Sequence, residues 1–140
     1  MLRTTTVLTG SMLLLCAGAL AAPPMVVVDE NTVVKEEPAP HGNIGMTTAY
    51  RISDAAPGRT MEFRKRTLHK GAAIGLHPMG HDEVYYVLSG TGEVTSDGVT
   101  KTVTKGMAAY IYAGSSTGLV QKGEEPLTII ISYPIPAPAK

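Results

Sequence analysis

Short β-prone segments separated by turn residues fill the chain from residue 47 to residue 133, and this pattern constrains the fold most. None of these segments has helical periodicity over a convincing length. The clearest turn is Asp97-Gly98, because an Asp-Gly pair between two β-prone segments favours a hairpin turn with positive φ at both central positions. The predicted strands are residues 47–52, 60–68, 84–88, 93–96, 99–103, 107–113, 118–121 and 127–133. Short antiparallel strands of this number predict an all-β protein that closes into a small jelly-roll barrel, whose interior can hold one small ligand.

The last predicted strand, residues 127–133, contains the successive isoleucines 129–131. A continuous apolar run indicates cover on both faces, one by the core and the other by a second sheet or subunit. We therefore expect a homodimer with a two-fold interface formed by outward apolar strand faces.

The N-terminal residues have the features of a secretory signal peptide. Arg3 supplies a positive charge, residues 7–20 are mainly apolar, and Ala19-Leu20-Ala21 is a small-x-small cleavage signal. We expect residues 1–21 to be removed and the mature protein to be secreted or periplasmic. An uncleaved membrane anchor and a lipid attached to Cys16 are the alternatives.

The mature chain is expected to be one domain with two short extensions. Removing residues 1–21 from 140 leaves 119, which is enough for one domain and not for two. Residues 22–46 are predicted to form an arm that adds an edge strand to its own barrel or to a second subunit. Residues 47–134 are predicted to form the barrel, and residues 135–140 a proline-rich, extended tail.

The charge pattern gives no reason to expect binding to nucleic acid, or to a membrane beyond the signal peptide. Arg3 is the only charge within residues 1–21, so twelve basic residues become eleven against twelve acidic ones. Arg64-Lys65-Arg66 is the one basic cluster, and a strand would place Arg64 and Arg66 on the same face. There they either form ion pairs on a solvated strand face or meet a carboxylate or phosphate of a ligand.

Two of the four histidines lie near a carboxylate in residues 71–92. His77, Met79, His81 and Glu83 occupy alternate positions, which share one face of an extended chain. Imidazole and carboxylate groups suit divalent zinc, iron, manganese or nickel, whereas a thioether suits soft ions such as Cu(I). A proline and a glycine interrupt the run, so the four side chains need not converge.

These residues resemble the first motif of the cupins. That motif is Gly, five residues, His, one residue, His, three or four residues, Glu, six residues, Gly. Gly71, His77, Glu83 and Gly90 are in register, and Met79 replaces the second histidine. The resemblance covers roughly residues 60–134 and implies the cupin jelly roll, or double-stranded β-helix.

The second cupin motif is less complete. It is Gly, five residues, Pro, one residue, Gly, two residues, His, three residues, Asn. Gly106 and Gly114 are in register, whereas Tyr112, Thr117 and Gln121 replace the proline, histidine and asparagine. The resemblance implies a metal held by three histidines and a glutamate, of which only His77 and Glu83 are retained. His81 is the best substitute for a missing imidazole, so the predicted metal ligands are His77, His81 and Glu83.

Two classes of function are consistent with this sequence. In the first, the domain is a metal-dependent isomerase, lyase or oxygenase acting on a small sugar or carboxylate. In the second, it is a metal-free module that binds such a ligand, and His77 and Glu83 are a hydrogen-bonded pair left from a lost metal site. The missing second-motif histidine favours the second class, and the retained His77 and Glu83 favour the first.

The other candidate site residues fall into two groups. Tyrosines are candidates for proton transfer: Tyr85, Tyr110 and Tyr112. Polar side chains are candidates for ligand binding: Arg64, Arg66, Thr117 and Gln121. His41 lies in the proline-rich loop 37–42, which can approach the site if that loop crosses the barrel mouth.

Overall fold

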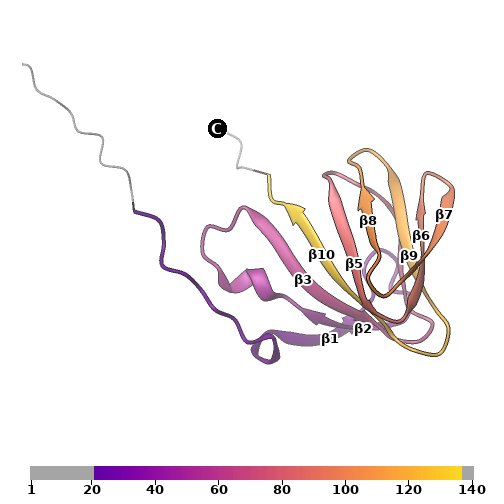
Figure 1. Cartoon of the computed structure of the whole chain (residues 1–140), viewed down its shortest axis with the longest axis horizontal. Coiled ribbons are helices and arrows are strands. Elements are labelled where there is room, and N and C mark those ends of the chain that lie inside the picture. The colour runs from indigo at the N-terminus through magenta and orange to yellow at the C-terminus, as the bar shows by residue number, and fades with distance from the viewer. Residues whose placement is uncertain (1–20, 137–140) are drawn as a thin grey trace, which may run out of the picture.

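A computed structural model of the chain describes residues 21–136, which form two antiparallel sheets (Figure 1). The first sheet has the strand order β1 (Val34–Pro38), β2 (Met46–Tyr50), β3 (Met61–Leu68), β10 (Leu127–Pro134), β5 (Glu83–Ser89) and β8 (Ala108–Ile111). The second has the order β4 (Ala73–Pro78), β9 (Ser116–Lys122), β6 (Thr91–Ser96) and β7 (Val99–Thr104). Two short 3₁₀ helices complete the described elements, η1 (Glu30–Thr32) and η2 (Ile52–Ala55).

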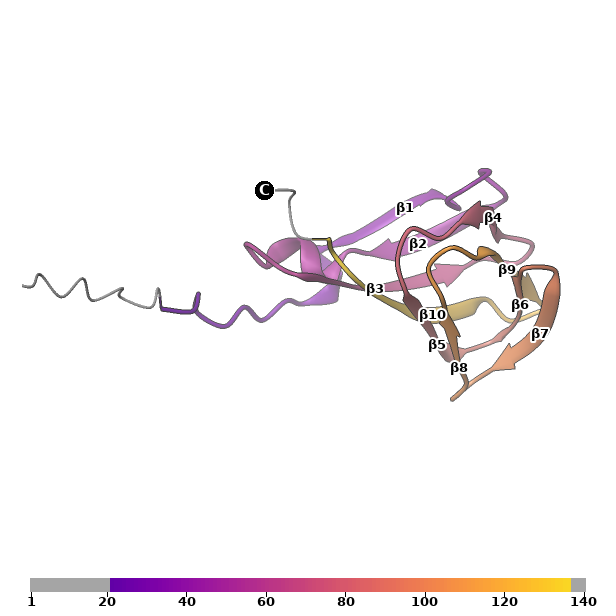
Figure 2. The same cartoon turned by 90° about the horizontal axis from the view of Figure 1, so that it is seen from above.

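The strands fold into two sheets (Figure 2), and the hydrophobic core contains buried side chains from both, which confirms the predicted all-β jelly roll. Strand alternation sets which side chains enter the core, since Tyr85 and Val87 of β5 are buried and Tyr86 between them is exposed. Its largest fully buried aliphatic side chains are Leu68, Leu119, Leu127, Ile129 and Val87. Each contributes roughly 1.5–3 kcal/mol through burial.

The turn between β6 and β7 is the hairpin expected at Asp97-Gly98. Asp97 has a φ of 48° and Gly98 a φ of 80°, so both central residues are in the left-handed region. Ser96 and Val99 pair directly across the turn. This geometry follows the right-handed twist of the two strands, which explains why an Asp-Gly pair is favoured there.

The N-terminal arm contributes the edge strand β1, which pairs with β2 of the same chain. The loop after β1, residues 39–45, then crosses to β4, where Ile44 bridges Ala73 and the Gly75 amide donates to the Pro40 carbonyl at 3.2 Å. Glycine is required at position 75 because a Cβ there would lie 1.6 Å from the His41 carbonyl oxygen. The arm is therefore fitted against the barrel at this point.

Several predictions fall on residues outside the described range. Residues 1–20 of the predicted signal peptide and residues 137–140 of the predicted tail lie outside residues 21–136. Within the described part of the chain, no helix has the length and apolar character needed to cross a membrane.

Candidate functional site

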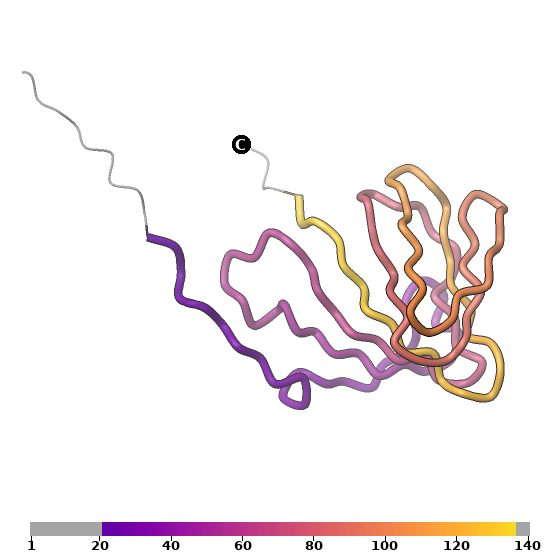
Figure 3. Tube along the Cα trace, viewed as in Figure 1, coloured from indigo at the N-terminus to yellow at the C-terminus, as the bar shows by residue number. Residues whose placement is uncertain are grey.

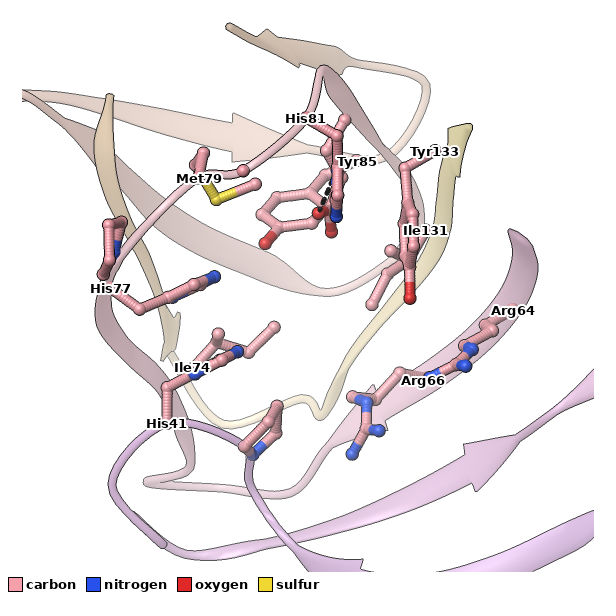
Figure 4. Close-up of a pocket in the computed structure, with 14 residues that line it drawn as sticks. His41, Arg64, Arg66, Ile74, His77, Met79, His81, Tyr85, Ile131 and Tyr133 are labelled. Carbon is pink, nitrogen blue, oxygen red and sulfur yellow. Dashed lines mark ion pairs between the residues drawn. The ribbon is translucent and has the colours of Figure 1, made fainter. Parts of the chain in front are cut away.

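A cavity of about 340 Å³ lies between β3, β4, β5, β10 and the loop that follows β1 (Figure 4). Apolar side chains form part of its wall, including Ile74, Met79 and Ile131. Its polar side chains are His41, Arg64, Arg66, His77, His81, Glu83, Tyr85 and Tyr133. Six of these eight were predicted as site residues from the sequence, namely Arg64, Arg66, His77, His81, Glu83 and Tyr85.

His77 extends into the cavity from β4 and has a defined hydrogen-bonding state. Its Nδ1 lies 2.8 Å from the Gly75 carbonyl oxygen, which can only accept a hydrogen bond. Nδ1 therefore carries a proton, and Nε2 of the neutral ring is left as an acceptor or ligand atom.

His41 reaches the same cavity from the loop after β1. Its ring stacks on that of His77 with 3.5 Å between the ring centroids and an interplanar angle of 5°. Burial lowers the pKa of His41, and the neighbouring His77 and Arg66 lower it further. A loop placed over the barrel mouth is thus part of the cavity wall.

His81 and Glu83 form a second pair. His81 lies across the cavity from His41 (Figure 4). The His81 Nδ1 is 3.8 Å from a Glu83 carboxylate oxygen, and the His81 ring stacks on Tyr133 at 4.2 Å between centroids. Burial raises the pKa of Glu83, with His81, His77, Tyr85 and Arg64 acting in the opposite direction. Burial likewise raises the pKa of Tyr85. The sequence predictions do not include Tyr133, although it shares the inward alternation of Ile129 and Ile131 along β10.

Arg64 and Arg66 lie on the same face of β3, as their spacing predicts, and this face is directed inward. Arg66 is buried and donates to the Thr47 hydroxyl at 2.6 Å and to a Glu37 carboxylate oxygen at 2.9 Å. Arg64 donates through Nε to Glu62 at 2.9 Å. Each arginine is held by a carboxylate. Because a guanidinium carries five N–H donors, each arginine keeps further donors for a ligand.

Thr117 and Gln121, predicted as ligand-binding residues, are not among the residues that line this cavity. Thr117 is fully buried on β9, where its hydroxyl is hydrogen-bonded to those of Ser115 and Ser96. The Gln121 amide accepts from the Gly71 backbone and donates to three backbone carbonyls, those of Lys122, Gly123 and Glu125. These polar groups are already used within the fold, and ligand binding by Thr117 and Gln121 stays a prediction that this cavity does not support.

Two of the three candidate tyrosines also lie outside the cavity lining. Tyr110 and Tyr112 are exposed and contact each other with their ring centroids 5.0 Å apart. The Tyr110 hydroxyl donates to the Asp82 carboxylate at 2.6 Å. Tyr85 is therefore the only one of the three candidates that lines this cavity.

The donor set does not form a metal shell. Within residues 21–136, no group of three or more His, Cys, Asp or Glu side chains is arranged to hold a metal ion. His77 stacks on His41 while His81 faces Glu83, so the predicted ligands share a cavity without converging. The nearby Met79 thioether is a poor ligand for the common divalent ions. This arrangement does not fit such an ion, and the centre on His77, His81 and Glu83 stays a prediction.

Comparisons with known proteins agree with this architecture. The chain is similar to a predicted oxalate decarboxylase from Thermotoga maritima, with a TM-score of 0.70 and 21% identity over 79% of this chain and 100% of that one. It is also similar to the polyketide cyclase RemF from Streptomyces resistomycificus, with a TM-score of 0.69 and 22% identity over 83% of each chain. A putative sugar phosphate isomerase from Acidithiobacillus ferrooxidans has a TM-score of 0.58 and 20% identity over 65% of this chain and 61% of that one. These identities are low, so the similarity concerns the fold.

No curated protein sequence matches the chain. The family model of the cupin domain matches residues 64–133, which are half of the 140 residues. This match includes β5 with its motif glutamate Glu83, and it extends into the last strand of the barrel. The chain therefore belongs to the cupin family.

Proposed function

We propose that this cupin binds a small hydroxylated carboxylate, such as a sugar acid, in the cavity between β3, β4, β5 and β10. The observation that carries the proposal is the pair of arginines, Arg64 and Arg66, on one wall of a cavity whose other walls carry imidazoles and phenols. A carboxylate accepts charge-assisted hydrogen bonds from guanidinium groups, and these are stronger than neutral ones.

The remaining polar groups suit hydroxyl groups on the ligand. His77 Nε2 is an acceptor for a ligand O–H, and the phenols of Tyr85 and Tyr133 both donate and accept. Ile74 and Ile131 provide apolar contact for the carbon skeleton. Such a combination of apolar walls and a few convergent polar groups is typical of small-molecule sites.

The size and charge of the cavity set further limits on the ligand. Its volume of about 340 Å³ lies at the lower end of the roughly 300–1,000 Å³ typical of ligand pockets, which favours a molecule of about one sugar ring. Glu37 and Glu62 already neutralise part of the charge on Arg66 and Arg64, so we expect moderate affinity. The names of two structural neighbours, an oxalate decarboxylase and a sugar phosphate isomerase, refer to small acidic molecules of the same general class.

A metal-dependent enzyme acting on the same kind of ligand is the second candidate. It is favoured by one observation, that His77, His81 and Glu83 line a single cavity. Because these side chains do not converge here, a metal-free binding site is the better supported of the two.

Arg64 and Arg59 provide a matched pair for testing ligand binding. Both donate to Glu62, but only Arg64 lines the cavity. Calorimetric titration with a uronate and with the corresponding neutral sugar should show binding of the uronate and at least about tenfold weaker binding of the neutral sugar. Arg64→Gln should abolish uronate binding, and Arg59→Gln should preserve it. Equal loss in both variants, or equal affinity for both sugars, would contradict the proposal.

We also infer that the chain is exported and cleaved after Ala21. The charged start, apolar segment and small-x-small end of residues 1–21 support this inference. The intact mass of protein recovered from a periplasmic fraction should begin at Ala22. A species there that retains Met1 would count against cleavage, and a lipidated species beginning at Cys16 would identify the lipoprotein alternative.

A further inference from the structure

In the two described sheets, β7 and β8 are consecutive strands that do not pair with each other. Residues 105–107 alone join them, and a connection of this length is short enough for a β-hairpin. Instead, β7 pairs with β6 in the four-stranded sheet, and β8 pairs with β5 in the six-stranded sheet. The two strands therefore diverge from the turn that joins them (Figure 3), and each forms an edge of its sheet.

A cavity of about 330 Å³, called here the β7–β8 cavity, lies between these two strands. Its wall is mainly apolar and includes three residues of the hydrophobic core, namely Val94, Val103 and Ile111. On β8 the wall is formed in part by Ala108 and Ala109, whose small side chains leave room beside the strand. None of the described residues lines both this cavity and the one between β3, β4, β5 and β10.

Lys101 is the only charged residue among the described residues that form this wall. Strand register places it directly opposite Val94 of β6, a core residue, so Lys101 belongs to the inward face of β7. Lys65, Lys70 and Lys122 each pair with a glutamate, whereas Lys101 is exposed and has no ion pair within residues 21–136. Its aliphatic stem can follow the apolar wall while its ammonium stays in water and is free to meet an anionic group.

The wall also keeps apolar surface in contact with water. Val99 is 61% exposed and Met107 is 46% exposed, although both line the cavity. A ligand with a hydrocarbon chain would remove this surface from water, which is favourable in proportion to the area covered. One cation beside an apolar wall thus matches a molecule with one anionic group and an apolar chain.

We propose that the β7–β8 cavity binds a medium-chain aliphatic carboxylate, with its chain against the apolar wall and its carboxylate at Lys101. An uncharged molecule with the same chain would gain nothing from the ammonium, and a short carboxylate would leave the apolar wall in water. The carboxylate and the chain are therefore both needed for binding. This site is separate from the one proposed for a sugar acid and does not depend on it.

Calorimetric titration of the purified chain with octanoate, below the concentration at which octanoate forms micelles, tests the proposal. We expect one octanoate bound per chain, and at least about tenfold weaker binding of both 1-octanol and acetate. From butyrate to octanoate, affinity should rise by about fourfold for each added CH₂ group, because each group is removed from water by the wall.

Lys101→Met should weaken octanoate binding by about tenfold and leave the weak binding of 1-octanol unchanged, whereas Lys101→Arg should retain octanoate binding. Lys105→Met is the matched control, because Lys105 is exposed in the turn after β7 and does not line the cavity. Both lysines are exposed, so these variants should fold, and circular dichroism checks that they do.

Three results would overturn the proposal: no octanoate binding to the wild type, equal affinity for octanoate and 1-octanol, or equal loss in Lys101→Met and Lys105→Met. Loss of octanoate binding in Arg64→Gln would also overturn it, because the carboxylate would then lie in the other cavity. Lys101→Met should bind a uronate as the wild type does. The tests of the two sites therefore stay separate, and either site can fail without the other.

Discussion

Replacing Glu62 by glutamine should reduce both the stability of the protein and its dependence on pH. Glu62 is 3% exposed and accepts hydrogen bonds from Arg64, Arg59 and Ser53. Burial alone would raise its pKa, but these hydrogen bonds outweigh burial and lower the pKa from an ordinary value of 4.5 to about 2. That difference corresponds to about 3 kcal/mol of folding free energy. Arg59 and Arg64 are 28% and 22% exposed, so solvent screening reduces the expected contribution to about 2 kcal/mol.

The sign of the pH effect follows from the lowered pKa. The stabilisation by Glu62 is fully present above pH 4.5 and is lost as the pH falls toward about 2, because the carboxylate must then be protonated in the folded state. Urea unfolding followed by circular dichroism at pH 7, 5, 4 and 3 should show wild type losing its advantage over Glu62→Gln across this range. Glu124→Gln, which removes an exposed ion pair with Lys70, should leave the pH dependence unchanged. A Glu62→Gln variant with the wild-type pH dependence would refute the reasoning.

Three further outcomes are expected. Gly75→Ala should displace the loop over the cavity, lower the melting temperature and abolish uronate binding, whereas Gly80→Ala, whose added Cβ meets no atom within 4 Å, should leave the melting temperature unchanged. Gln121→Ala should destabilise the fold by about 1–3 kcal/mol in urea unfolding, because it removes the hydrogen bonds between the buried Gln121 amide and the backbone, and uronate affinity should be retained. Calorimetric titrations with zinc, manganese, nickel and iron at neutral pH test metal binding, which Met79→His should strengthen and Glu83→Ala should abolish. If the wild-type protein binds a uronate but none of these ions, the metal-dependent enzyme is ruled out.

The architecture was predictable because its signals are local. The Asp97-Gly98 pair sets a hairpin through backbone preferences alone, and the two central φ values are those expected. Strand alternation likewise placed Arg64 and Arg66 on the same face of one strand. Such features depend on neighbours within a few residues, so a single sequence contains the information that they require.

The parts of the site that depend on distant contacts were harder to predict. His41 joins the cavity only because residues 39–45 cross to β4, and that crossing depends on the missing side chain of Gly75, more than thirty residues away. Gln121 occupies a position of the second cupin motif, yet its amide is directed at a nearby turn and not at the cavity. Motif register identifies a position in the barrel, whereas the hydrogen-bond partners available there decide its role.

The carboxylates that hold the two arginines connect the proposed site to the stability of the fold. The Glu37 carboxylate accepts a hydrogen bond from Arg66 and so fixes the position of its guanidinium. Burial alone would raise the pKa of Glu37, but hydrogen bonds from Arg51 and Arg66 outweigh burial and keep this pKa below its ordinary value. Glu62 holds Arg64 in the same way. Both guanidinium groups are therefore positioned before a ligand arrives, so ligand binding need not order these two long side chains. The same pairing reduces the positive charge available to a ligand carboxylate. A site built in this way favours selectivity by shape and hydrogen bonding over tight electrostatic capture, which suits reversible binding of a small acid.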